Sequence, residues 1–204
     1  MNTFALWLSL SYSSRGRAVV ARQFDLLKVA SSTLAPVTIN TMKILTLSIK
    51  REFFDQILNG TKTHEYREVH PNKSDKYYLL RHRDKLYKSK EIDNIPDDEE
   101  GVFYDLRQYD AIKFLTGAYS GKRPWMLVEV KDVALQFAYE HEKDQDTKLT
   151  PDKIIWQDAA DENIPEELIQ LRYVFGEGDD EWYWELQQMD YTLGKVLDKN
   201  LNPE

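Results

Sequence analysis

The chain contains no cysteine, and its 204 residues include only four histidines. Without cysteine, no disulfide and no thiolate metal site can form, and the histidines show no metal-ligand spacing such as H-E-x-x-H. We therefore expect no metal and no cofactor. The lack of cysteine also fits a reducing compartment, so we expect a cytoplasmic protein.

Long apolar runs and excess positive charge are also missing. No apolar run approaches the ~20 residues that span a bilayer, so we expect no membrane contact. Residues 1–41 hold four basic residues and one acidic residue, which leaves 23 basic and 34 acidic residues in the remainder. Non-specific nucleic-acid binding depends on Lys and Arg that neutralise phosphates. Any contact of this acidic chain with nucleic acid must therefore be local.

The N-terminal 41 residues form a basic, acid-poor leader with no sustained hydrophobic period. A transit peptide is one interpretation of such a composition. The other is that the working protein begins at Met42, after a disordered or loosely helical leader. We adopt the second interpretation, and we expect one domain over residues 42–204.

A strand, a helix and a charged second strand follow one another closely after Met42. Residues 44–49 form a short apolar run of strand length. Phe53, Phe54, Ile57 and Leu58 then recur with the spacing of one helical face. Gly60 comes directly after this pattern, where a left-handed C-cap favours glycine. The sequence therefore predicts a strand, a short helix and a glycine stop.

The residues after this helix carry a motif. Gly60, Lys62, Glu65 and Arg67 spell G-x-K-x-x-E-x-R, and this pattern resembles the signature of the ASCH family. The run beginning at Asp110 (DAIKF) also resembles a strand of that family, although Tyr109 replaces the usual glycine. The resemblance implies an α+β fold: a PUA-like small mixed β-barrel flanked by helices. It also implies binding of RNA or nucleosides, with Lys62, Glu65 and Arg67 at the site.

The resemblance further implies an enzymatic alternative. Small bacterial members of the family deacetylate N4-acetylcytidine with a lysine, a threonine three residues later and a glutamate within a strand. In this chain these positions hold Lys62, Glu65 and Glu129, so the threonine hydroxyl is replaced by a carboxylate. A metal-free amidohydrolase would then use water activated by Glu129, with Lys62 stabilising the oxyanion. The catalytic candidates are Lys62, Glu129 and Glu65.

Aromatic residues near the predicted cleft complete the set of candidates. Tyr66, Tyr119 and Trp125 have flat rings suited to stacking on a base. Packing within strands is the alternative interpretation for all three.

The rest of the chain is expected to form acidic helical or loop insertions, at residues 73–108 and 140–180. The period predicts a helix over 74–90, whose basic residues either balance the acids around it or contact phosphate. A loop is expected at 91–100, and a second helix from Pro165 to Phe175. The remaining strands are expected at residues 110–116, 124–136, 182–189 and 191–197.

Three functions remain open on these grounds. The first is a binding module for RNA or a modified nucleoside. The second is an amidohydrolase that acts on an N-acylated cytidine-type nucleoside. The third is a protein-interaction domain that uses the acidic insertions, with partners that the sequence does not name.

Overall fold

The computed structural model describes residues 42–98, 100–117, 122–145, 147–161, 163–177 and 181–201. The predicted leader, residues 1–41, lies outside these ranges. The described chain divides into two compact units. The motif unit comprises residues up to 65, 108–133 and 191–201, and the hairpin unit comprises residues 66–107 and 134–190. Each is described by itself below.

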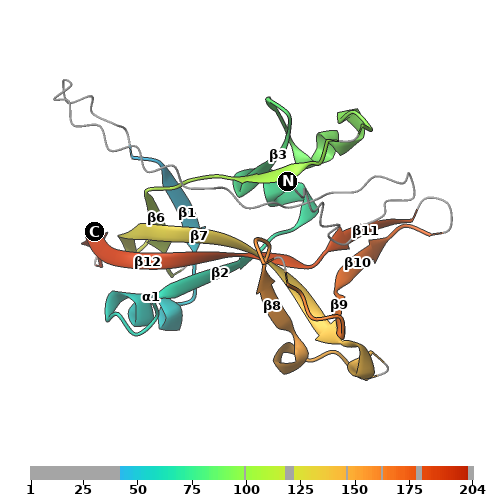
Figure 1. Ribbon diagram of the computed structural model, residues 1–204. Helices are drawn as coiled ribbons and strands as arrows, with labels where there is room; N and C mark the ends of the chain where they lie inside the picture. The colour runs from blue at the N-terminus through green and yellow to red at the C-terminus, as the bar shows by residue number, and fades with distance from the viewer. Residues whose placement is uncertain are drawn as a thin grey trace, which may run out of the picture. The chain divides into compact units, whose positions relative to one another are not determined.

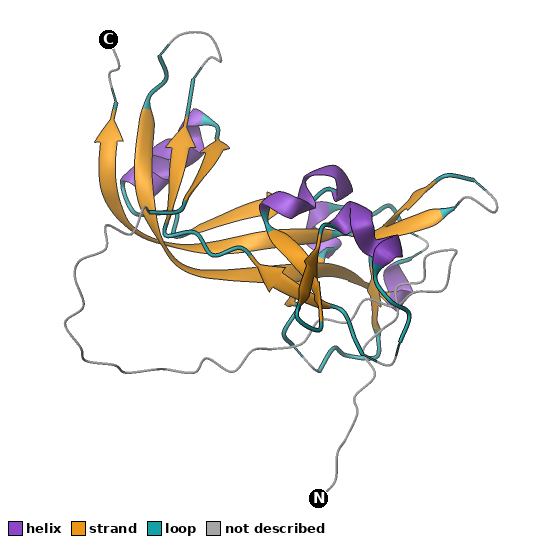
Figure 2. Ribbon diagram, turned by 90° about the horizontal axis from the view of Figure 1, so that it is seen from above, coloured by secondary structure: helices purple, strands orange, loops and turns teal. Residues whose placement is uncertain are grey.

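Strands dominate the described chain, as Figure 2 shows. The main sheet pairs in the order β1-β6-β7-β12-β2, with β8 and β9 also paired to β7. Two small sheets, β4-β3-β5 and β10-β11, are paired separately from it. The predicted sheet-rich α+β class is confirmed. The predicted closure into a barrel is not seen, because β1 and β2 end the pairing order of the described strands.

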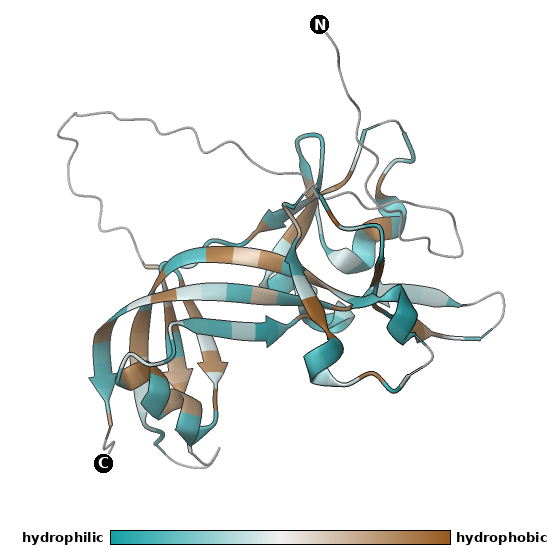
Figure 3. Cartoon of the chain, turned by 60° about the horizontal axis from the view of Figure 1, so that its bottom comes forward, coloured by the Kyte–Doolittle hydropathy of each residue, from teal (hydrophilic) through white to brown (hydrophobic). Residues whose placement is uncertain are grey.

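The motif unit contains the predicted strand and helix. Strand β1 runs parallel to β6, which is antiparallel to β7, and helix α1 follows β1 (Figure 1). Apolar side chains that alternate along these strands form the core, and Figure 3 shows the hydrophobic colour on the strands beside α1. The bounds are β1 Ile44–Ser48, α1 Arg51–Leu58, β6 Ala111–Leu115, β7 Trp125–His141, β2 His64–Glu68 and β12 Gln187–Asn200. The last three strands continue into the hairpin unit.

Helix α1 ends as its sequence predicts. Phe54 and Ile57 are buried, as expected for its apolar face. Gly60 has φ +78°, a left-handed conformation that side chains with a Cβ adopt at a cost. The backbone N–H groups of Thr61 and Lys62 both donate to Gln56 O, at 2.9 and 3.1 Å. This cap turns the chain sharply and delivers Lys62 to the start of β2.

The predicted helix over 74–90 is wrong. Residues Tyr78–His82 form β3, and Lys85–Tyr87 form β4, with Leu80 level with Tyr87 across the hairpin. Tyr78, Leu80 and His82 are buried in strict alternation, which is the period of a strand. Within residues 71–98, only Pro71–Lys76 (η1) and Ser89–Asn94 (η2) are helical, as 3-10 turns, and the second overlaps the segment 91–100 that was predicted as a loop.

The predicted helix from Pro165 to Phe175 is also wrong. Leu168–Gln170 form β9 on the edge of β7, and Arg172–Phe175 form β10, which pairs with β11, Trp182–Glu185. The aromatic and β-branched residues of this segment favour strands once a partner is present. The break between β11 and β12 lies at Leu186, whereas the strands predicted over 182–189 and 191–197 placed it at residue 190.

The hairpin unit also contains β5 Phe103–Leu106, η3 Glu142–Asp144, η4 Pro151–Lys153 and β8 Ile155–Asp158.

Candidate functional site

The centre of the candidate site is an ion pair within the motif. Lys62 Nζ lies 3.3 Å from Glu65 Oε2, and the two side chains are only 19% and 6% exposed. Lys62 Nζ also donates to the backbone carbonyl of His64, and it lies 5.7 Å from the centre of the Phe53 ring. A carboxylate buried in a strand needs such a partner, because an unpaired buried charge is strongly destabilising. The motif therefore places one donor and one acceptor side by side, partly shielded from water.

The register of β2 against β12 shows which face Glu65 occupies. Leu193 N donates to Thr63 O at 2.8 Å, and Val69 N donates to Gln187 O at 2.9 Å. This antiparallel register brings Glu65 level with Tyr191. Tyr191 is completely buried, so Glu65 points to the buried face of the sheet. His64 and Tyr66, the residues on either side of Glu65, are more exposed.

Glu129 lies on the other face of the same sheet. Its neighbours Met126 and Val128 are buried, whereas Glu129 belongs to the alternate, partly exposed set of β7. A Cβ placed on Gly194 would lie 2.3 Å from Glu129 Oε2 and 2.9 Å from Glu129 Cβ, so the carboxylate covers this glycine. Lys195 N lies 3.4 Å from the same oxygen and donates to it. The structure thus brings Lys62 and Glu65 together but does not bring Glu129 to the face that Glu65 occupies.

The close approach of Glu129 to Gly194 was not predicted from the sequence. Gly194 lies inside β12, within a stretch interpreted only as a closing strand. A glycine within a strand pattern often marks a position where another group approaches the backbone closely. That signal could have paired Gly194 with a neighbouring side chain, although it could not have identified Glu129.

Three basic side chains influence one another in the hairpin unit: Arg67, Lys73 and Lys76. Desolvation lowers the pKa of the Lys76 ammonium, and the positive charges of Arg67 and Lys73 lower it further. Lys76 is exposed, but it is close enough to Arg67 and Lys73 for their charges to act on it. Such a group favours an anion, and Lys76 lies in the segment 74–90, for whose basic residues phosphate contact was one of two interpretations.

The predicted stacking residues have different surroundings. Tyr66 is 48% exposed, and its partial burial together with the negative charge of Asp190 raises the pKa of its hydroxyl. Trp125 begins β7, and Lys113 Nζ lies 4.4 Å from the centre of its ring. One face of this indole therefore already contacts a cation. Tyr119 lies outside the described residues.

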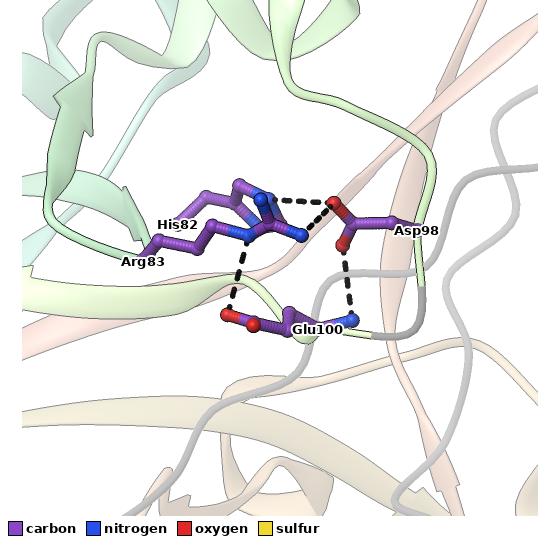
Figure 4. Close-up of polar contacts among 4 residues, drawn as sticks. All are labelled: His82, Arg83, Asp98 and Glu100. Atoms are coloured by element: carbon purple, nitrogen blue, oxygen red, sulfur yellow. Dashed lines mark hydrogen bonds and ion pairs between the residues drawn. The ribbon is translucent and has the colours of Figure 1, made fainter.

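A second polar cluster joins β3 to the acidic segment that follows η2, as Figure 4 shows. Arg83 Nη2 donates to Asp98 at 2.8 Å, and Arg83 Nε lies 3.4 Å from Glu100. The buried His82 places Nε2 3.3 Å from the same Asp98 oxygen. Desolvation raises the pKa of Asp98, but the Glu100 N–H and the charges of Arg83 and His82 outweigh it, so the pKa is lowered. The cluster holds Asp98 and Glu100 against the turn after β3.

No metal centre or membrane helix is found in the part of the chain that the structure describes. No three His, Asp or Glu side chains there are grouped to hold a metal ion. Within the same ranges, no helix has the length and apolar character needed to cross a membrane.

Comparison with known proteins identifies the family. The strand-rich α+β fold, and a Lys-Glu pair directly after a glycine-capped helix, define a small domain with a charged motif on its second strand. The ASCH domain model matches residues 47–183, and the chain belongs to this family. No curated protein and no solved structure matches the chain. The matched residues include α1, the motif and Glu129.

Proposed function

We propose that the chain binds RNA or a modified nucleoside in a small charged site built on Lys62 and Glu65. The observation that supports this most strongly is their shielded ion pair, with 3.3 Å between Nζ and Oε2. An ammonium beside a carboxylate offers a donor and an acceptor, which complement the donor and acceptor groups on the edge of a nucleobase. Membership of the ASCH family is consistent with such a ligand.

The negative net charge of the chain favours a short nucleic-acid ligand over a long one. The chain has a formal net charge of −8, which repels a polyanion at long range. We therefore expect one or two phosphates to be contacted, and a salt slope of about −0.7 to −1.4 in log K against log salt for a single strand.

Binding of labelled cytidine-containing oligonucleotides and of free N4-acetylcytidine tests this proposal. Lys62→Ala should weaken binding by about tenfold, as expected for the loss of a charged hydrogen bond. Lys50→Ala is the matched control, since Lys50 precedes α1 and its Nζ lies 6.0 Å from the Phe53 ring. Equal effects of the two substitutions would refute the assignment. So would a steep salt slope that Lys62→Ala leaves unchanged and neutralisation of residues 73–90 removes.

Arg67 allows a separate test of the motif. Arg67→Lys keeps the charge and removes the planar guanidinium fork, so it should weaken binding if the fork is used. Unchanged affinity would leave Arg67 outside the site, without affecting the assignment of Lys62 and Glu65.

A metal-free amidohydrolase on N-acylated cytidine is a second candidate, favoured by the same ion pair. Glu65 would activate water and Lys62 would stabilise the oxyanion, because Glu129 occupies the other face of the sheet. Release of acetate from N4-acetylcytidine by the purified chain, abolished by Lys62→Ala and by Glu65→Gln, would establish this activity. Binding without release would leave the first proposal alone.

A further inference from the structure

The β10–β11 hairpin forms a two-stranded sheet of its own in the hairpin unit (Figure 1). Its base is held by backbone hydrogen bonds, from Leu171 N to Ala138 O at 2.8 Å and from Leu186 N to Leu171 O at 2.9 Å. The strands beyond this base pair only with each other among the described strands. An isolated two-stranded sheet is marginal in water, so its side chains need further contacts.

Four aromatic residues share one face of this hairpin. The register places Tyr173 opposite Trp184, and Phe175 opposite Trp182, and residues two apart on a strand point the same way. We call these four side chains the aromatic face. The Phe175 and Trp182 rings are stacked, with centroids 4.3 Å apart and planes inclined by 14°.

The two ends of the aromatic face differ in their contacts. At the base, the Tyr173 hydroxyl donates to Glu68 at 2.6 Å, and Trp184 Nε1 donates to Val69 O at 3.0 Å. Toward the tip, Trp182 remains 39% exposed although its ring is stacked on Phe175. The outer pair therefore presents a flat aromatic surface to solvent.

The hairpin segment itself has a negative net charge. Residues 172–185 contain one basic and five acidic residues. Arg172, the one basic residue, lies on the opposite face together with Glu185. Its guanidinium carbon is 4.2 Å from the centre of the Tyr183 ring, whose hydroxyl donates to Glu181. A phosphate backbone would be repelled here, and a second copy of the hairpin would bring acid against acid. A cationic partner is complementary both to the acids and to the electron-rich ring faces.

We propose that the aromatic face binds a basic segment of a partner protein, with an Arg or Lys side chain over the Phe175–Trp182 stack. The negative net charge of the hairpin attracts the segment, and the rings hold its cation by stacking. This proposal is independent of the nucleoside site, since it uses no residue of the motif.

A fluorescently labelled nonapeptide of alternating Arg and Gly is the probe, titrated with the full chain at low and at physiological salt. Trp182→Ala should weaken binding by about tenfold, whereas Trp182→Phe should stay within about threefold because it keeps an aromatic surface. Val174→Ala is the matched control: Val174 lies on the opposite face and is more exposed, at 54%. It should change the affinity by less than about twofold.

Several results would overturn the proposal. Equal binding by Trp182→Ala and the parent would show attraction by net charge alone, and equal losses in Trp182→Ala and Val174→Ala would show a general loss of the hairpin. Circular dichroism of each variant separates these outcomes from unfolding. A labelled uridine oligomer that binds the parent chain and fails to bind Trp182→Ala would assign the aromatic face to RNA instead.

Discussion

Two regions of this molecule use large apolar side chains in opposite ways. In β1 and α1, the side chains of Leu45, Leu47, Phe54 and Ile57 are all buried. In the β10–β11 hairpin, Tyr173, Val174 and Trp182 all remain exposed. The first region is stabilised by removing apolar surface from water, and the second by ring stacking and a few hydrogen bonds. Substitutions should therefore lower the free energy of unfolding far more in the first region than in the second.

The largest effect is expected at Phe54, whose side chain is 0% exposed. Phe54→Ala should lower the free energy of unfolding by about 3–5 kcal/mol, because it removes buried surface and leaves a cavity. Chemical denaturation monitored by circular dichroism measures this loss. The neighbouring Phe53 is 37% exposed, so Phe53→Ala should cost about 1 kcal/mol or less. Similar losses at both positions would contradict the helix orientation described here.

A smaller loss is expected when Gly194 is replaced. Gly194→Ala would place a Cβ 2.3 Å from the Glu129 carboxylate and 2.9 Å from its Cβ, which forces one strand to shift. We expect a loss of about 1–3 kcal/mol, as for other overpacked sites. The same substitution should cost less in a Glu129→Gly background, where both contacting atoms are gone. An identical cost in the two backgrounds would show that Glu129 is not the obstacle.

Substitution of Gly60 measures the cost of a left-handed backbone conformation in the absence of any steric contact. No atom lies within 4 Å of a Cβ built on Gly60, so only its φ of +78° opposes substitution. Gly60→Ala should cost about 1–2 kcal/mol in thermal or chemical unfolding. Gly60→Asn should cost less, since asparagine tolerates the left-handed region. Equal costs for alanine and asparagine would point to a cause other than this conformation.

The smallest effect is expected in the hairpin, and it depends on pH. The hydrogen bond that Tyr173 donates to the Glu68 carboxylate, together with burial and the charge of Glu68, raises the pKa of Tyr173 from 10.0 to about 12. A raised pKa stabilises the fold fully below pH 10, and this contribution disappears as the pH rises from 10 to 12. The difference in thermal midpoint between the parent and Tyr173→Phe should be constant below pH 10 and shrink above it.

Tyr139 also titrates in this range, since burial and the charge of Glu185 raise its pKa to about 12. Its contribution is present in both proteins and cancels in the comparison. A midpoint difference that does not change between pH 9 and pH 12 would show that the Tyr173 hydrogen bond contributes nothing to stability.

The segment from Ile44 to Glu68 could be predicted because its signals are local. The apolar run, the helical spacing of Phe54 and Ile57, and Gly60 as the helix stop all act within a few residues of one another. The structure confirms the strand, the helix and the left-handed glycine. The motif that follows identifies the family, and it also predicted that Lys62 and Glu65 belong to one site; their ion pair is consistent with that prediction.

The segments 74–90 and 165–175 could not be predicted in the same way. Tyr78, Leu80 and His82 become strand residues because β4 and β5 pair with β3 on both sides. The aromatic residues of β10 become strand residues because β11 pairs with them. Strand pairing depends on partners that lie elsewhere in the chain, so the propensity of one segment alone does not determine it.

The sequence by itself determined the glycine-capped helix and the charged motif, because capping and helical period act over one or two turns. Only the tertiary structure decided that Glu65 lies on the buried face with Lys62 while Glu129 lies over Gly194 on the other face. The reason is physical: the face on which a strand residue lies depends on register, and a shift of one residue would exchange the two faces. Register is set by pairing between β2, β12 and β7, which are far apart in the chain.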